Sequence, residues 1–224
     1  MKKEVLAAII TVAVVVVYTI FFEKQPVFKN TGRGNIALGG DIELKRFNSK
    51  GHPKSEGYEL VVKYPSTWTA QEAERPHIIQ KFMTTDGDGI LVGCMLQARK
   101  LPVSISEQEN AEMVSEMTEA DLSIEEQYPG ARILKFNRTR YEGIPGVYFQ
   151  MEVPAERANN WTHALRDVHI VAYKNLMVEM DCAATGSEKV TTMEAVRNKF
   201  IQNQRPFDLF ANSFIIMDKY KEED

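Results

Sequence analysis

The sequence predicts an α+β fold: an antiparallel β-sheet with helices packed on it as an α/β/α sandwich, preceded by one N-terminal transmembrane helix. Three observations lead to this prediction. Residues 5–22 are apolar and uncharged, most later segments alternate as strands do, and two longer segments show helical spacing. Because strands come in groups between single helices, the order is typical of an α+β protein.

The apolar run Val5–Phe22 contains no charged residue. A helix over this run rises ~27 Å at ~1.5 Å per residue, close to the hydrocarbon thickness of a bilayer. A cleaved signal peptide needs small residues after the run, but residues 18–24 are bulky, hydroxylated or charged, and no lipid-accepting cysteine follows. A core helix would be amphipathic, and this run is apolar all round. We interpret Val5–Phe22 as an uncleaved anchor in the lipid bilayer.

The orientation of the anchor follows from chain length more than from charge. Lys2 and Lys3 precede the run, and Lys24, Lys29 and Arg33 follow it, so the positive-inside count is nearly balanced. Long domains translocate largely regardless of charge, and short basic tails stay inside. We therefore expect a single-pass protein of the inner (cytoplasmic) membrane with its C-terminal domain in the periplasm, or a type II protein in a eukaryote.

The remaining chain divides into a spacer and one folded domain. Residues 23–57 are rich in glycine and polar residues, with one strand-like stretch at 42–47. We assign 1–22 to the anchor, 23–57 to the spacer and 58–224 to the domain. About 200 residues after the anchor suffice for one sizeable core.

The domain should contain three strands, a helix, three or four strands and a second helix. The first strands and helix fall at 58–64, 77–84, 90–99 and 106–127. The second group falls at 132–141, 147–153, 168–183 with a break near Lys174 and Asn175, and a helix at 187–202 capped by Ser187 and stopped by Pro206. The segment 207–216 closes the domain.

Two short strings resemble a known family. Tyr64-Pro65-Ser66-x-Trp68 opens the domain, and Phe207-x-x-Phe210-x-x-Ser213-Phe214 lies near its end. With the order of elements, residues 58–218 resemble the PsbP/Mog-like superfamily, which includes the PsbP subunit of photosystem II, a nuclear Ran-binding factor and exported bacterial proteins of the DcrB kind. The resemblance implies an α/β/α sandwich used as a binding module, without a catalytic centre common to the superfamily.

Several function classes find no support in the sequence. A net charge of −4 without a basic tract argues against nucleic acid. We find no Gly-x-Ser-x-Gly elbow and no cysteine beside a plausible base, so we predict no enzyme activity and no cofactor. Cys94 and Cys182 fall on apolar strand faces, and we expect two separate reduced thiols, since sequence does not tell whether their strands are neighbours.

We interpret the histidines as residues of the surface and of the sheet face and predict no metal site, but one alternative stays open. His163 and His169 lie near Asp167, and Glu179 or Asp181 could complete a metal site, although no spacing enforces it. The corresponding function is a periplasmic small-ligand or metal-binding carrier that uses the sheet face around His169, Tyr148 and Tyr173.

The acidic segment between Leu101 and Ala131 is the main candidate for a partner-binding site, because it contains no lysine or arginine and eight acidic residues. We expect a helical stripe of Met113, Met117, Ala120 and Ile124 to face the sheet and to turn four glutamates towards solvent: Glu112, Glu116, Glu119 and Glu126. A solvated acidic face without a partner is the other interpretation. We predict a membrane-tethered extracytoplasmic non-catalytic binding or scaffolding protein, an accessory subunit or assembly factor of a larger membrane complex.

The anchor can be tested directly. If Val5–Phe22 spans the bilayer uncleaved, the full-length protein stays in the membrane fraction on carbonate extraction, and a chain that starts near Gly57 is soluble. A mature N-terminus after Phe22 in mass spectrometry would contradict the prediction. Protease accessibility from the outer face tests the orientation separately.

Overall fold

The computed structural model describes residues 41–85, 89–157, 160–187 and 191–221. Within these ranges no helix is long and apolar enough to cross a membrane. The apolar run Val5–Phe22 lies outside the described residues, so the anchor stays a prediction.

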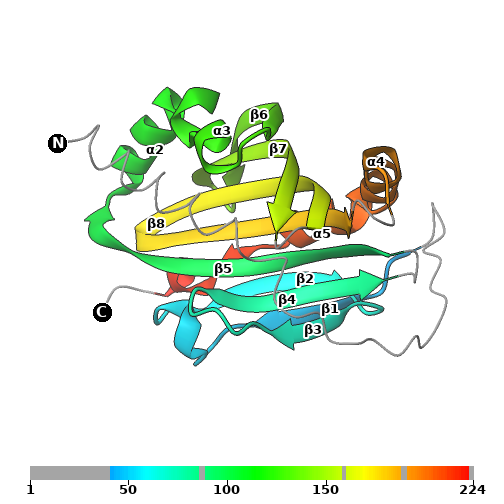
Figure 1. The fold of residues 1–224 in the computed structure, drawn as a ribbon. Coiled ribbons are helices and arrows are strands. Elements are labelled where there is room, and N and C mark those ends of the chain that lie inside the picture. Colours follow the sequence, from blue (N-terminus) through cyan, green and yellow to red (C-terminus); the bar gives the residue numbers. More distant parts are fainter. Residues whose placement is uncertain (1–40, 86–88, 158–159, 188–190, 222–224) are drawn as a thin grey trace.

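A six-stranded antiparallel sheet forms the centre of the fold, in the order β3-β4-β5-β8-β7-β6 (Figure 1). Its strands are β3 (Thr69–Glu72), β4 (Ile78–Thr85), β5 (Ile90–Ile105), β6 (Arg132–Tyr141), β7 (Ile144–Arg157) and β8 (Asn160–Ser187). The α+β prediction is confirmed, and most predicted strands lie at or near their expected positions. The short edge strand β3 has no clear alternation in sequence and was not predicted.

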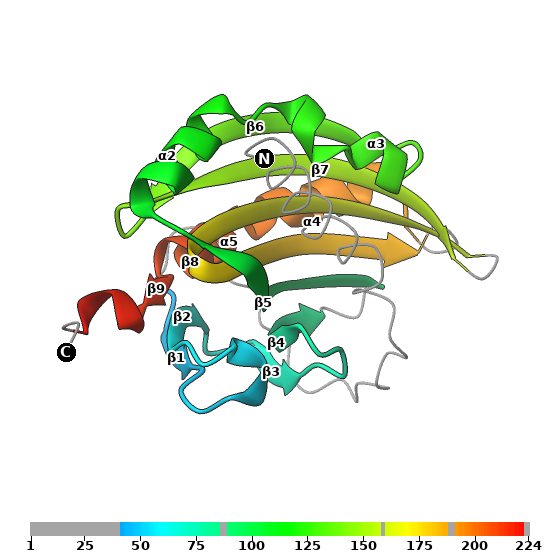
Figure 2. The same cartoon turned by 90° about the vertical axis from the view of Figure 1, so that its left-hand side faces the viewer.

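Strand β8 doubles back on itself. Its first half, residues 160–171, pairs with β7, and its second half, residues 174–186, pairs with β5. Lys174, at the start of the second half, has a left-handed backbone (φ 53°). Figure 2 shows the ribbon of β8 reversing its direction. The sequence analysis places a break at this point, and the pairing confirms it.

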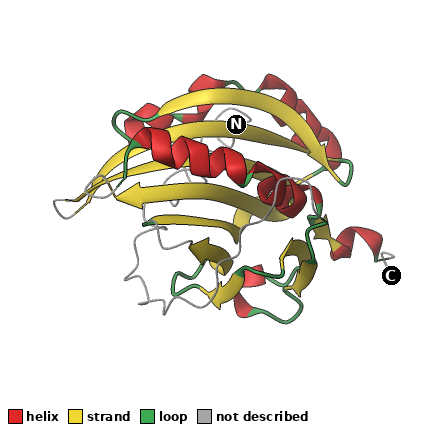
Figure 3. Ribbon diagram, turned by 90° about the vertical axis from the view of Figure 1, so that its right-hand side faces the viewer, coloured by secondary structure: helices red, strands yellow, loops and turns green. Residues whose placement is uncertain are grey.

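Helices cover both faces of the sheet, as Figures 2 and 3 show from opposite sides. One layer comprises α2 (Glu107–Glu116), the 3-10 turn η3 (Glu119–Leu122) and α3 (Ile124–Gln127); the other comprises α4 (Met193–Gln202) and α5 (Gln204–Asn212). Each layer closes its own core. Val114 and Ile124 pack with Phe149 and Val168 on the first face. On the second face the buried set includes Val171, Met180, Phe200 and Phe207.

A small sheet, β1-β2-β9, packs beside α5. It contains β1 (Leu44–Asn48), β2 (Leu60–Pro65) and β9 (Ile215–Ile216), with η2 (Pro53–Ser55) before β2 and η4 (Met217–Tyr220) after β9. Strand β1 falls in the segment assigned to the spacer, where one edge strand was expected, and it pairs along β2. A soluble version of the domain should therefore start near Asp41, not Gly57.

The helices differ from prediction at three places. The expected helix 106–127 is broken into α2, η3 and α3, because Thr118 and Asp121 form a second capping box and Ser123 has a left-handed backbone (φ 46°). Helix α4 begins after Thr192, whose hydroxyl accepts from Ala195 N at 3.2 Å, and not after Ser187, which ends β8. Pro206 was expected to stop the helix, but it lies in the first turn of a new helix, α5, where proline is tolerated.

The cysteine prediction is wrong. Cys94 and Cys182 form a disulfide, with Cα atoms 4.0 Å apart. Both were correctly placed on the apolar face, and both are fully buried. They lie directly opposite each other because β5 and β8 are neighbours in this register, which no local pattern reveals.

Because the bridge closes a segment of 88 residues, the chain-entropy relation gives it about 4–5 kcal/mol of stability. We expect the Cys94→Ala/Cys182→Ala variant to lose stability of this order in urea unfolding. The control is the reduced wild-type protein, which should unfold at the same urea concentration as the variant. Reaction of the denatured, non-reduced protein with a thiol reagent would contradict the bridge.

Candidate functional site

The four predicted partner-binding glutamates are all exposed, in the layer formed by α2, η3 and α3. We call Glu112, Glu116, Glu119 and Glu126 the acidic surface. It lies over the β6–β7 side of the sheet, shown in green at the top of Figure 1. The structure thus confirms their exposure, while binding of a partner stays a prediction.

The side chains that hold this layer on the sheet differ in one place from the expected stripe. Met117 and Ile124 are buried and Met113 is half-buried, but Ala120 is exposed. Leu122 takes its place with 1% exposure, because the 3-10 geometry of η3 and the left-handed Ser123 shift the spacing of buried positions. A continuous helical period could not have predicted this.

Asn110 and Arg138 fix the two ends of α2. Asn110 is buried, and its Nδ2 donates to Pro145 O at 3.1 Å and to Ala172 O at 2.9 Å. Arg138 on β6 donates to Val114 O at 2.9 Å and to Met117 O at 2.7 Å, which satisfies carbonyls at the C-terminal end of the helix. These bonds hold the acidic surface in a fixed position on the sheet.

The basic residues that follow the acidic segment have other partners. Arg138 caps α2, Arg132 pairs with Glu152 at 2.7 Å, Arg140 donates to Gly143 O at 2.9 Å, and Lys135 lies 5.3 Å above the Tyr148 ring. Across the described ranges, no ion pair joins Glu116, Glu119 or Glu126 to a cation. Their negative charge therefore faces solvent.

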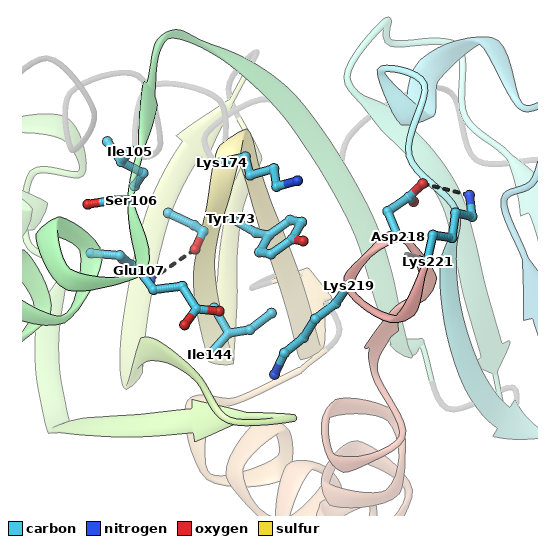
Figure 4. Close-up of a pocket in the computed structure, with 11 residues that line it drawn as sticks. Ile105, Ser106, Glu107, Ile144, Tyr173, Lys174, Asp218, Lys219 and Lys221 are labelled. Carbon is cyan, nitrogen blue, oxygen red and sulfur yellow. Dashed lines mark hydrogen bonds and ion pairs between the residues drawn. The ribbon is translucent and has the colours of Figure 1, made fainter. Parts of the chain in front are cut away.

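A pocket of about 410 Å³ lies at the N-terminal end of α2 (Figure 4). Four segments far apart in the chain line it: the start of α2, Ile144, the β8 turn and η4 with Lys221. Ile144, Ala172 and Tyr173 are buried, whereas Glu107 and Lys174 are exposed. Tyr173, named in the carrier hypothesis, belongs to this pocket, but His169 and Tyr148 do not line it. The sequence analysis missed the pocket, because its walls meet only in the folded chain.

The hypothetical metal ligands are divided between the two faces of β8. Asp167 accepts from Tyr148 Oη at 2.8 Å and from Gln204 Nε2 at 2.9 Å, on the α5 side, and His169 contacts Tyr141 and Tyr148 there. Burial lowers the pKa of His169 to about 4 and so keeps the ring neutral. Within the described part of the chain, no three His, Cys, Asp or Glu residues are grouped for a metal. The hypothetical ligands Asp167 and His169 therefore do not meet Glu179 and Asp181.

Glu179 and Asp181 point to the opposite face, into a buried polar cluster. Arg166 donates to Asp181 through Nε at 3.2 Å and also through Nη2, and Gln97 Nε2 donates to Glu179 Oε1 at 3.0 Å. Glu179 Oε2 has no hydrogen-bond partner among the described residues. Burial and the neighbouring Asp181 raise the Glu179 pKa to about 8, against the opposing effect of Arg166 and Arg99. Glu179 is therefore protonated at neutral pH and serves the core as a neutral acid.

Comparison with known proteins gives similarity at the level of structure alone. No family model matches the chain, and no curated protein matches it. The structure is similar to cyanobacterial PsbP from Synechocystis sp. PCC 6803, with a TM-score of 0.44, 13% identity and coverage of 82% of this chain and 98% of the other. It is also similar to LpqN of Mycobacterium tuberculosis, described as involved in cell envelope biogenesis, with a TM-score of 0.45, 8% identity and coverage of 77% and 91%.

A third similar structure is a protein of Bacteroides thetaiotaomicron VPI-5482, with a TM-score of 0.39, 11% identity and coverage of 73% of this chain and 47% of the other. The comparison thus includes a PsbP protein, the group that the two sequence strings resemble. With all three TM-scores below 0.5, the functional proposals rest on the residues of this chain.

The raised pKa of Glu179 predicts a pH-dependent stability. Between its ordinary pKa of 4.5 and the native value of about 8, the folded protein retains a proton that the unfolded chain has released. The stabilising contribution of Glu179 to the free energy of unfolding is therefore fully present below about pH 4.5 and is lost as the pH rises through about 8.

We expect Glu179→Gln, which keeps an acceptor for Gln97, to flatten this decline. The variant should exceed wild type by more than about 1 kcal/mol at pH 9 in urea unfolding, since one pKa unit corresponds to ~1.4 kcal/mol. Replacing the exposed Glu125 by Gln is the matched control and should leave the profile unchanged. An unchanged profile in Glu179→Gln would show that the carboxyl is ionised in the core.

Proposed function

We propose that this protein is a membrane-tethered extracytoplasmic, non-catalytic binding module that docks a basic surface of a partner protein through Glu112, Glu116, Glu119 and Glu126. In this proposal it serves as an accessory subunit or assembly factor of a larger membrane complex. Val5–Phe22 supplies the tether and residues 41–221 the docking domain.

The exposure of all four carboxylates in one layer of the fold is the observation that supports this proposal most. Three of them have no cationic partner among the described residues, and the nearby Arg132 and Arg138 are engaged with Glu152 and with the end of α2. A like-charge pair such as Glu112 and Glu116, spaced i,i+4 on α2, costs a few tenths of a kcal/mol. A local cost without a structural gain is expected where a surface has a function.

The electrostatics of such a surface suit association with a basic partner. Exposed charges of one sign raise the encounter rate with an oppositely charged surface. The attraction is screened beyond ~10 Å at 0.1 M salt, so assembly should depend on ionic strength. The attachment of α2 through Asn110 and Arg138 fixes the backbone that carries Glu112 and Glu116, so that binding needs no ordering of this helix.

A small-ligand carrier is the second candidate function, and the pocket beside Tyr173 is the observation that favours it. Its volume of about 410 Å³ falls within the range of ~300–1,000 Å³ that is usual for ligand sites. The metal-binding form of this hypothesis has no such support, because Asp167 and His169 lie on one face of β8 and Glu179 and Asp181 on the other.

The docking surface can be tested with Glu112→Gln/Glu116→Gln/Glu119→Gln. Folding should be unchanged or slightly stabilised, because like-charge repulsion is relieved. Association with the membrane complex should weaken about tenfold at low salt, and its salt dependence should flatten, because long-range attraction is lost. Co-purification in mild detergent over a salt series measures both effects.

The matched control is Glu56→Gln/Glu72→Gln/Glu74→Gln, which removes three exposed charges near the opposite end of the sheet. It should assemble like wild type at every salt concentration. If the triple variant of the acidic surface also assembles with wild-type affinity throughout, that surface is solvated and has no part in docking.

A further inference from the structure

The walls of the pocket at the start of α2 are held in place by hydrogen bonds between distant segments. Asp218 on η4 accepts from Glu59 N at 2.7 Å, and Tyr220 Oη donates to Glu142 Oε2 at 2.8 Å. Lys219 donates to Glu142 O from the same turn. The wall formed by η4 is thereby fixed to the β6–β7 turn and to the start of β2, so the pocket is preformed.

Part of the interior of the pocket is apolar. Ile144, Ala172 and Tyr173 are at most 8% exposed, and half-buried Ile105 adds to them. Tyr173 also packs edge-to-face against Tyr58 at 6.3 Å between ring centroids, which fixes its ring. Such a surface accommodates a hydrocarbon side chain and gains free energy in proportion to the apolar area removed from water.

Charged side chains of both signs form much of the rest of the lining (Figure 4). Asp218 and Lys221 pair with each other at 2.6 Å and so compensate locally. The remaining charged groups of the lining are the Glu107 carboxylate from α2 and the ammonium groups of Lys174 and Lys219 from the β8 turn and η4. A ligand with a single charge would be attracted by the groups of opposite sign and repelled by the groups of like sign.

Asn110 fixes the wall of the pocket beside Glu107. The two residues are spaced i,i+3 on α2 and so share a face of the helix. Asn110 Nδ2 donates to Pro145 O at 3.1 Å and to Ala172 O at 2.9 Å, and these bonds hold the start of α2 against the β8 turn. Glu107, which is exposed, is therefore the group of this wall that offers an acceptor to a ligand.

We propose that this pocket binds a small zwitterion with an apolar side chain, of the class of amino acids and dipeptides. Its ammonium group lies towards Glu107, its carboxylate towards Lys219, and its side chain against Ile144 and Tyr173. This site does not depend on the docking function proposed above, because none of the four glutamates of the acidic surface lines the pocket.

The test uses the full chain in detergent solution and three forms of L-alanyl-L-leucine. The free dipeptide carries both charges, its N-acetyl form only the carboxylate, and its C-terminal amide only the ammonium group. Isothermal titration calorimetry should show the free dipeptide binding at least about tenfold more tightly than either derivative, since each loses one charged hydrogen-bonding interaction.

Two variants assign the ends of the ligand. Glu107→Gln should weaken the free dipeptide about tenfold and bring it level with its N-acetyl form, and Lys219→Gln should bring it level with its amide. Glu125→Gln, which removes an exposed carboxylate outside the pocket, is the control and should bind like wild type. Thermal unfolding checks that each variant is folded.

Two results would overturn the proposal. One is that no form of the dipeptide binds to wild type at millimolar concentration. The other is that a singly charged derivative binds as tightly as the free dipeptide, which would assign the pocket to a simple anion or cation. Neither result bears on partner docking, since the acidic surface is tested by different residues and a different measurement.

Discussion

The hairpin of β8 is the element on which the rest of the structure depends, because its alternate residues face opposite layers. Val168 and Met177 point to the α2–α3 layer, and Val171 and Met180 point to the α4–α5 layer. The hairpin also joins β5 to β7, and its second half carries Cys182 opposite Cys94. A shift of one residue in this register would exchange the two cores and separate the cysteines.

The same alternation decides where the polar groups of the interior lie. Arg166, Glu179 and Asp181 lie together near Tyr128, which follows α3. Asp167 and His169 both contact Tyr148 on the α5 side. Burying an ion pair costs desolvation energy, so the pair of Arg166 and Asp181 is tolerated only because its hydrogen bonds are made. The protonated Glu179 avoids a further buried charge. These groups serve the core, whereas the four glutamates of the acidic surface are exposed.

Local sequence patterns predict the features that depend on neighbouring residues. The alternation of residues 90–98 places Ile90, Val92, Cys94, Leu96 and Ala98 on one face, as the core confirms. The exposure of the four glutamates follows in the same way, because the helical stripe that begins with Met113 and Met117 faces the sheet and turns the glutamates away from it. The disulfide, strand β3 and the pocket depend on which strands become neighbours. The formation of α5 over Gln204–Asn212, where no helix was predicted, depends on the apolar face that the sheet offers to Phe207 and Phe210.

The central claim is that α2 to α3 form the docking face of the domain. Hydrogen–deuterium exchange of the protein, free and within its complex isolated in mild detergent, tests this claim most directly. We predict that backbone amides between Glu107 and Gln127 exchange more slowly in the complex, and that the difference decreases as salt is raised. Protection confined to other elements, such as β3 and β4, with unchanged exchange across α2 and α3, would contradict the claim.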